Sequence, residues 1–246
     1  MKLTSIIVLF LFKYAASGSL EKRLVGGGFA VAGQFPYQVS LRNGVFVHFC
    51  GGSIIKDYWV LTSAHCIFNT NPQYTNVVVG TILLTSGGTT LQIKKYIFNQ
   101  GYNPTTLKSN IALIQTFDRI LNTWGTAVVP INLASVLLGQ VGYISGWGQV
   151  NLSSSVYSTK LKYIRATVIA INYCKQLLPQ YIIDDTMLCT LDIGQGNCHG
   201  DNGNPLVSNN VLIGLVSWGI PCAVGKPDVL TNIVSFSSWI ILNSQN

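Results

Sequence analysis

The sequence predicts an all-β protein that ends in one short helix, and two patterns support this prediction. Short runs of β-branched and aromatic residues recur between Gly, Asn and Pro residues, a spacing typical of β-sandwiches and β-barrels. At the end of the chain, Phe236, Trp239, Ile240 and Asn243 follow helical spacing, so a helix with one apolar face is expected over about 233–243. The expected strands are Tyr37–Leu41, Tyr58–Leu61, Val77–Val79, Leu91–Ile97, Ile111–Gln115, Val141–Ser145, Leu161–Ile169 and Val211–Trp218.

The composition favours a large buried core. Hydrophobic residues make up 48% of the chain and charged residues only 9%, which argues against disorder. Leu121–Ser135, which contains Gly125 and Pro130, is the best candidate for a connection between two β units.

Residues 1–17 have the layout of a secretory signal peptide. Met1-Lys2 is a basic start, Ile6–Phe12 is an apolar run, and Tyr14–Gly18 supplies the small residues of a cleavage site. The apolar run is too short to span a bilayer, so a secreted, extracellular protein is expected. An amphipathic N-terminal helix of the folded domain remains the alternative.

The charge of the chain gives no sign of a nucleic-acid partner. The whole sequence carries +7, and residues 24–246 carry eleven Lys and Arg against seven Asp, which leaves +4. The local concentrations at Lys94-Lys95 and at Lys160, Lys162 and Arg165 are small, and the latter alternate as on a solvated strand face. No nucleic-acid module is recognisable, and no later segment is apolar enough to span a membrane. Neither kind of partner is expected.

Six cysteines behind a signal peptide predict three disulfides, for which counting alone allows fifteen pairings. No pair of cysteines has C-x₂-C spacing and the three histidines are far apart in sequence, so no metal and no cofactor are expected. Asn151 begins a glycosylation sequon in a serine-rich stretch that is expected to be an exposed loop.

Seven short motifs occur in an order and at intervals that together are very specific. They are Arg23–Gly27 (RLVGG), Cys50–Ser53 (CGGS), Leu61–Cys66 (LTSAHC), Asn110–Leu113 (NIAL), Ile144–Gly148 (ISGWG), Gly200–Pro205 (GDNGNP) and Ser217–Gly219 (SWG). This set strongly resembles the trypsin/chymotrypsin family of serine proteases, from about Arg23 to the end of the chain.

The resemblance implies a fold of two packed six-stranded antiparallel β-barrels with a short C-terminal helix. It implies a propeptide over 18–23 and a peptidase domain over 24–246, with barrels over about 35–122 and 128–232. It also implies three disulfide pairings, Cys50–Cys66, Cys174–Cys189 and Cys198–Cys222.

The resemblance also identifies the catalytic positions, two of which are altered. His65 matches the family's histidine, but Asn110 stands where the family has aspartate and Asn202 stands where it has the serine nucleophile. An amide nitrogen has no lone pair to offer as a nucleophile, and an amide cannot stabilise an imidazolium as a carboxylate does. Loss of the carboxylate alone costs about 10⁴ in turnover.

Other parts of the family's machinery are retained. Arg23-Leu24 matches the activation cut made by a trypsin-like protease, after which the amine of Leu24 is expected to pair with Asp201. His48 matches a residue that holds that aspartate in some zymogens. The N–H groups of Gly200 and Asn202 are expected to form an oxyanion hole. The family's second glycine of this motif is Asn204 here, which puts the loop geometry in question.

Three positions define the expected specificity pocket, and one strand is expected to hold the substrate backbone. Gly196 replaces the aspartate of trypsins at the pocket floor, Gly219 lines one wall, and Asp228 stands opposite where the family usually has glycine. This combination is similar to the collagenolytic proteases of crustaceans and to some insect enzymes, and Asp228 could pair with Lys or Arg. A plain turn aspartate after Pro227 is the alternative. The substrate strand comprises Ser217, Trp218 and Gly219.

The altered catalytic positions lead to the expectation that the chain is not an enzyme. A secreted, processed, non-catalytic protease homologue is expected, a monomer that binds a protein or peptide through its cleft, with an active protease or an inhibitor among the candidate partners. One alternative is an active serine-type endopeptidase, as family membership implies. Another is a structural or carrier protein with an idle cleft.

Overall fold

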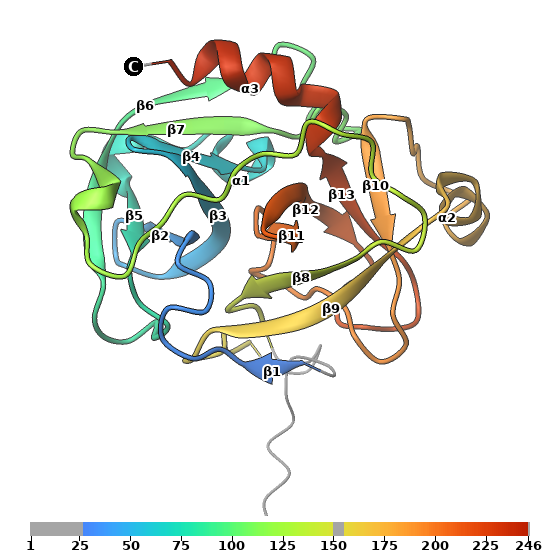
Figure 1. Ribbon diagram of the computed structural model, residues 1–246, viewed down its shortest axis with the longest axis horizontal. Coiled ribbons are helices and arrows are strands. Elements are labelled where there is room, and N and C mark those ends of the chain that lie inside the picture. The colour runs from blue at the N-terminus through green and yellow to red at the C-terminus, as the bar shows by residue number, and fades with distance from the viewer. Residues whose placement is uncertain (1–26, 150–154, 246) are drawn as a thin grey trace, which may run out of the picture.

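Two closed antiparallel β-barrels lie side by side in the computed structural model (Figure 1). The structure describes residues 27–149 and 155–245. The expected signal peptide, Arg23, Leu24 and the sequon at Asn151 lie outside these residues, so those predictions stay untested.

The first barrel is closed by six strands in the order β2-β3-β4-β7-β6-β5. Its core contains Val39, Ile54, Val77 and Ile114, all almost fully buried, because β-branched side chains alternate toward the barrel interior. The strands are β2 (Gln38–Asn43), β3 (His48–Lys56), β4 (Trp59–Thr62), β5 (Thr75–Val79), β6 (Thr89–Phe98) and β7 (Ala112–Thr116).

The second barrel runs β9-β10-β13-β12-β11-β8 and closes through a pairing of β8 with β9. A short strand, β1 (Gly28–Phe29), adds to the outer edge of β9. The strands are β8 (Val141–Gly146), β9 (Lys162–Ile169), β10 (Met187–Thr190), β11 (Pro205–Ser208), β12 (Val211–Gly219) and β13 (Asp228–Asn232). The prediction of two six-stranded antiparallel barrels is therefore confirmed, whereas the exact domain bounds stay a prediction.

Five strands, β1, β3, β10, β11 and β13, were not expected from the sequence pattern alone. Strand β3 contains a Gly-Gly pair and β11 begins with proline, both poor strand signals, while β10 and β13 are only four and five residues long. The terminal helix begins as a 3₁₀ turn, η3 (Ile233–Phe236), and continues as α3 (Ser237–Asn243). The remaining helices are α1 (Ala64–Ile67), η1 (Pro72–Tyr74), η2 (Ile120–Asn122) and α2 (Ile171–Leu177).

The terminal helix packs over the seam between the barrels (Figure 1). One buried cluster joins Trp59 and Leu113 of the first barrel, Leu215 of the second, and Ile233 and Ile240 of the terminal segment. Burial of this apolar surface fixes the two barrels against each other, and with them the two sides of the cleft.

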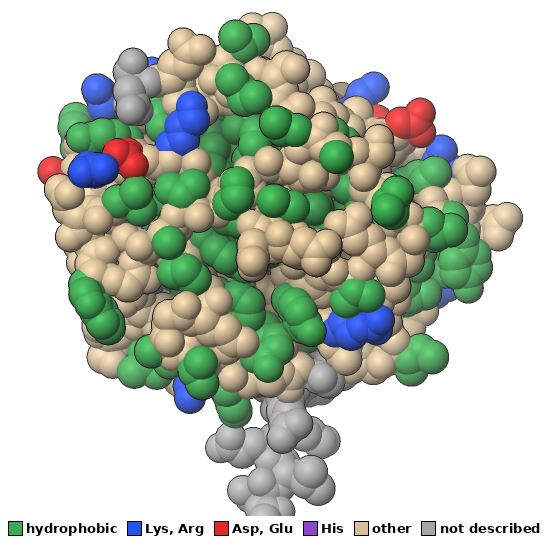
Figure 2. Space-filling view, viewed as in Figure 1, with side chains coloured by type: hydrophobic (Ala, Val, Ile, Leu, Met, Phe, Trp, Pro, Cys, Tyr) green, Lys and Arg blue, Asp and Glu red, His purple; other side chains and the backbone are tan. Residues whose placement is uncertain are grey.

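The three expected disulfides are confirmed: Cys50–Cys66, Cys174–Cys189 and Cys198–Cys222. Figure 2 shows few charged side chains on the face that it presents. Among the described residues, no helix combines the length and apolarity needed to cross a lipid bilayer.

Candidate active site

The side chains of His65 and Asn110 contact each other, although they come from two separate segments of the first barrel. His65 lies in α1, which follows β4, and Asn110 lies two residues before β7. Asn110 is 1% exposed, and its Oδ1 accepts the main-chain N–H of His65 at 2.9 Å. This bond turns the amide nitrogen of Asn110 toward Nδ1 of His65, at 2.8 Å, and toward Oγ of Ser217, at 2.7 Å. The retained histidine is therefore held by an amide in the place of a carboxylate.

The hydrogen bond from Asn110 determines the tautomer of His65. Because Nδ2 of Asn110 can only donate, Nδ1 of His65 accepts, and the proton of the neutral ring is on Nε2. Burial lowers the pKa of His65 below its usual value, so the ring is neutral near pH 7. In this tautomer Nε2 offers a proton to the cleft and does not accept one.

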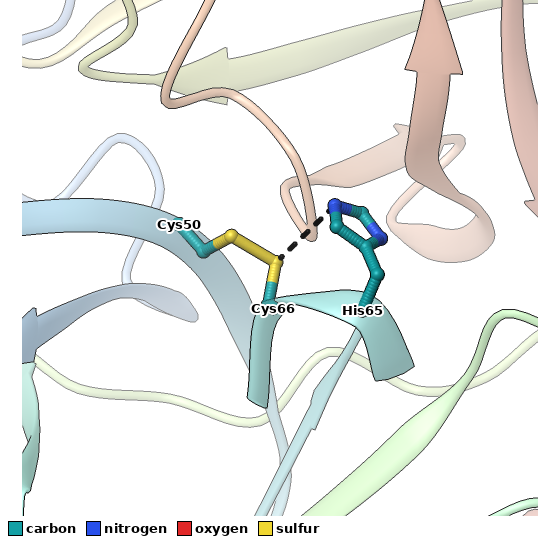
Figure 3. Close-up of side chains that lie close together, drawn as sticks. All are labelled: Cys50, His65 and Cys66. Carbon is teal, nitrogen blue, oxygen red and sulfur yellow. Dashed lines mark hydrogen bonds between the residues drawn. A yellow bond between two sulfur atoms is a disulfide. The ribbon is translucent and has the colours of Figure 1, made fainter. Parts of the chain in front are cut away.

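Nε2 of His65 lies 3.9 Å from Sγ of Cys66, beside the Cys50–Cys66 disulfide (Figure 3). The three side chains place possible metal-ligand atoms within 4.8 Å of one another. Both sulfurs are already bonded to each other, so neither is the thiolate that a metal needs. This cluster does not fit a metal site.

Asn202 lies in the loop 198–204, between β10 and β11. The loop is anchored to the first barrel, because Gly51 donates its main-chain N–H to the Asn202 carbonyl at 2.8 Å. Gly200 has φ = 92°, and a Cβ at this position would lie 2.6 Å from the ring of Tyr157, so glycine is needed here. In the described part of the chain, the N–H groups of Gly200 and Asn202 have no hydrogen-bond acceptor. Of these two residues, Asn202 lines the pocket beside the loop, whereas Gly200 is buried.

Asp201 is buried beside this loop, with 1% of its surface exposed. Its carboxylate accepts the N–H of Gly148 at 2.9 Å, the N–H of Cys198 at 3.0 Å and Nδ2 of Asn204 at 3.0 Å. Burial outweighs these bonds and raises the pKa of Asp201 to about 6.

The hydrogen bonds of the His48 ring go to groups other than the Asp201 carboxylate. Its Nδ1 bonds to Oγ of Ser40 at 2.9 Å, and its Nε2 lies 3.0 Å from the Gly200 carbonyl. Burial lowers the pKa of His48 to about 4, so the ring is neutral and donates from Nε2 to Gly200.

A pocket of about 210 Å³ opens beside Asn202, and Trp218, Gly219 and Asp228 are among the residues that line it. Asp228, the first residue of β13, is 8% exposed and accepts the N–H of Asn197 at 3.0 Å. Burial raises the pKa of Asp228 to about 7. A Cβ at Gly219 would approach Oδ1 of Asp228 to 2.8 Å, so the glycine leaves room for this carboxylate.

The structure thus brings Asn202, Trp218, Gly219 and Asp228 to one pocket. Gly196 does not line the pocket, and the position of its missing Cβ lies 3.0 Å from the Cα of Ala223. Asn197 and His199 do line the pocket and were missed, because nothing in the sequence around Cys198 marks which neighbours point inward.

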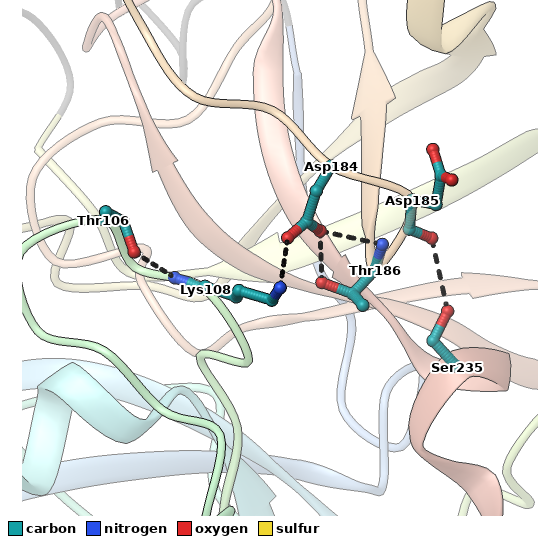
Figure 4. A network of polar contacts seen from close by, with 6 residues as sticks. All are labelled: Thr106, Lys108, Asp184, Asp185, Thr186 and Ser235. Carbon is teal, nitrogen blue, oxygen red and sulfur yellow. Dashed lines mark hydrogen bonds and ion pairs between the residues drawn. The ribbon is translucent and has the colours of Figure 1, made fainter.

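A second, larger groove of about 460 Å³ adjoins the pocket and shares Trp218 and Gly219 with it. One side is formed by residues 105–107 and the other by residues 180–182. The ion pair of Lys108 with Asp184, at 3.6 Å, links the segments that carry these two sides (Figure 4). The ring of Tyr181 lies 4.9 Å from that of Trp218. No pattern in the sequence marked residues 105–107 or 180–182 as part of a site.

The arrangement of two barrels, a histidine on α1 and a loop with free N–H groups next to a pocket can be compared with known proteins. The family model described as Trypsin matches residues 24–240. The chain belongs to the trypsin family.

Relatives of this family cover nearly the whole chain. Trypsin beta of Drosophila erecta is 34% identical over 92% of this chain and 90% of that protein. Chymotrypsin-2 of Vespa crabro is 38% identical over 89% of this chain and 99% of that protein. Trypsin I-P1 of Gallus gallus is 36% identical over 89% and 88%, respectively.

These relatives overturn the expectation that this trypsin-family chain is not an enzyme. Proteins that are 32–38% identical over most of its length are named trypsins and a chymotrypsin, which points to an active protease. The expectation gave decisive weight to Asn110 and Asn202. These two residues change how the chemistry can proceed, and a catalytic role has to be explained with them in place.

Proposed function

We propose that the protein is a secreted endopeptidase of the trypsin family that binds an extended polypeptide along β12 and hydrolyses it slowly. The observation that carries this proposal is the pocket in which Asp228 faces the loop of Asn202, since it joins a recognition group to free N–H donors. The three disulfides agree with an extracellular site of action.

The pocket supports a substrate with Lys or Arg next to the bond that is cleaved. Asp228 is the one carboxylate among the residues that line the pocket, and an ionised carboxylate in a partly dry site pairs strongly with a cationic side chain. The adjoining groove, with Leu107, Tyr181 and Ile182, suits apolar side chains on the preceding residues.

The chemistry proposed for this site uses water as the nucleophile. Water adds to the carbonyl carbon, the N–H groups of Gly200 and Asn202 stabilise the oxyanion, and collapse breaks the C–N bond to leave a carboxylic acid and an amine. The protons are exchanged with solvent, because Asn110 holds His65 in the tautomer that cannot accept one at Nε2. Binding and the oxyanion hole alone leave roughly 10³–10⁴-fold catalysis over water.

When turnover is slow, dissociation and not cleavage limits how long a polypeptide stays in the cleft. A tightly held loop, such as that of an inhibitor or of another protease, is therefore a natural partner for this site. Processing after Arg23 by a trypsin-like protease is part of the same proposal.

The test uses the protein after cleavage at Arg23, at high concentration, in a prolonged incubation with a peptide that contains one Arg. The products are identified by mass spectrometry. The expected result is cleavage after Arg that persists after treatment with an organophosphonate, because the chain has no nucleophilic serine at residue 202 to be labelled. Asp228→Asn, purified in the same way, is expected to lose most of this cleavage. Product formation equal to that of buffer alone would overturn the proposal, and cleavage abolished by the phosphonate would assign the activity to a serine nucleophile.

A further inference from the structure

Asn197 forms part of the wall of the pocket that contains Asp228, and it is only 6% exposed. Its main chain is held on both sides. The N–H of Asn197 donates to Oδ2 of Asp228 at 3.0 Å, and its carbonyl accepts the N–H of Cys222 at 2.8 Å. The next residue, Cys198, is bonded to Cys222 by a disulfide. The Asn197 side chain therefore projects from a part of the wall whose backbone is fixed by three separate links.

The side-chain amide of Asn197 is left without a hydrogen-bond partner. Its Oδ1 and its Nδ2 are both buried, and neither forms a hydrogen bond with any residue that the structure describes. The side chain approaches Asp228 and favours the ionised form of that carboxylate, but the approach falls short of hydrogen-bond geometry. Buried polar groups without a partner are costly and rare, so an unmet donor and an unmet acceptor in one pocket wall point to a ligand that supplies both.

The other polar side chains of the pocket differ from Asn197 in what they need. His199 is exposed and Asn202 is half-buried, so water can satisfy both. Trp218 also has a buried nitrogen without a partner, but an indole offers only a donor. Among the described residues that line the pocket, Asn197 is therefore the one whose side chain keeps both an unmet donor and an unmet acceptor away from solvent.

The chemical group that matches this amide is another primary carboxamide. The oxygen of a carboxamide accepts a hydrogen bond from Nδ2 of Asn197, and its NH₂ group donates one to Oδ1, so both atoms are satisfied by one ligand. Its second N–H is left for the carboxylate of Asp228, which lines the same pocket. Ammonium and guanidinium groups only donate, and they leave Nδ2 of Asn197 without an acceptor. Asn197 thus favours a different side chain from the cation that Asp228 favours.

We infer that Asn197 is a specificity-determining residue through which the pocket also binds a side chain that ends in a primary carboxamide, as glutamine does. This inference rests on the proposed function, because it adds a second class of substrate to the pocket proposed for Lys and Arg. The two classes depend on two different residues, Asn197 for the carboxamide and Asp228 for the cation, and they can therefore be separated by substitution.

The first arm of the test needs no substitution. The protein after cleavage at Arg23 is titrated by calorimetry with N-acetylglutamine amide and with N-acetylmethionine amide. Methionine has a side chain of similar length without the hydrogen-bonding end, so it is the matched apolar control. We expect the glutamine ligand to bind at least about fivefold more tightly than the methionine ligand, as for a gain of hydrogen bonds to buried groups. Equal affinities would overturn the inference.

The second arm compares two substitutions in the same pocket. Asn197→Leu removes both polar atoms and keeps the branched shape, so the glutamine ligand should bind only as well as the methionine ligand. The affinity of N-acetylarginine amide should change by less than about threefold. Asp228→Asn should do the reverse, with arginine binding weakened about tenfold or more and glutamine binding kept within about threefold. Unchanged glutamine binding in Asn197→Leu, or an equal loss of both ligands, would overturn the inference.

If Asn197→Leu does not fold, the side-chain NH₂ signal of Asn197 in the native protein is followed by nitrogen NMR. The glutamine ligand should shift this signal and the methionine ligand should not, and a signal that glutamine leaves unmoved would overturn the inference. No readout depends on turnover. Binding of the glutamine and arginine ligands without any hydrolysis would count against the proposed activity alone. Cleavage after Arg without a preference for glutamine over methionine in binding would overturn this inference alone.

Discussion

The two sides of the cleft differ in which of the family's catalytic and substrate-binding groups they retain. On the side of His65, an amide replaces a carboxylate and another amide replaces a hydroxyl, and the hydrogen bonds at 2.8 and 2.7 Å around Asn110 hold the ring in a proton-donating form. On the side of Asp228, the pocket has a buried carboxylate, a glycine that leaves it room, and an aromatic groove beside it.

Substrate recognition and proton transfer thus depend on different residues of the same fold, and one can change without the other. Strand β12 serves both, since Ser217 receives the Asn110 amide while Gly219, two residues on, faces Asp228. Because each barrel is closed by its own strand pairings, we expect a change of a few side chains on one side to leave the backbone of the other intact. The predictions below test how complete this separation is.

The largest effect is expected from restoring the proton-transfer side. Asn110→Asp with Asn202→Ser supplies a hydroxyl and a carboxylate that reverses the tautomer of His65, so kcat should rise by about 10⁶ over the native chain. The measurement is hydrolysis of the same Arg-containing peptide.

Single revertants refine this prediction. Asn202→Ser alone should gain only about 10², because Asn110 still holds the wrong tautomer, and Asn110→Asp alone should gain little because no hydroxyl is present. A double revertant no faster than the native chain would mean that the two sides are not separable, and that the cleft differs in more than these residues.

A smaller effect is expected when a change of pH alters the charge of Asp228, on the substrate-recognition side of the cleft. Asp228 binds a cation only when ionised, and with a pKa of about 7 its ionised fraction rises as pH rises from 6 to 8. The affinity of N-acetylarginine amide, measured by calorimetry, should rise roughly tenfold over that interval. Asp228→Asn should bind weakly with a flat profile, and a rise that survives this substitution would assign the titration to another group.

The smallest effect is expected at the groove. Lys108 is largely exposed, so its pair with Asp184 is worth at most about 1 kcal/mol. Lys108→Met should weaken binding of a peptide with apolar residues in the groove by less than about fivefold, and 1 M NaCl should erase the difference. Arg119→Met, which breaks the Arg119–Asp57 pair away from the groove, is the matched control and should change nothing.

Much of this molecule could be predicted from its sequence, and the limits have physical reasons. The alternating strands and the ordered motifs predicted the barrels and the disulfides. A hydrogen-bond network of Gln38 with Asn204 and Ser145 could not be predicted, because the bonded residues are about 100 residues or more apart and meet only across the barrels. The groove formed by residues 105–107 and 180–182 was missed for the same reason.

The prediction of inactivity failed for a different reason. Asn110 and Asn202 can be read directly from the sequence, but a rate cannot be deduced from missing groups alone, since binding and backbone donors also contribute to catalysis.

The terminal helix has a consequence for the cleft, although it contributes no residue to the pocket or to the groove. Ile233 and Ile240 pack in one cluster with Trp59 and Leu215, and so they help to hold the two barrels together. A carboxypeptidase that removed the residues up to and including Ile240 would weaken this packing. The geometry of the cleft therefore depends on apolar contacts of a segment that supplies none of the residues lining the pocket or the groove.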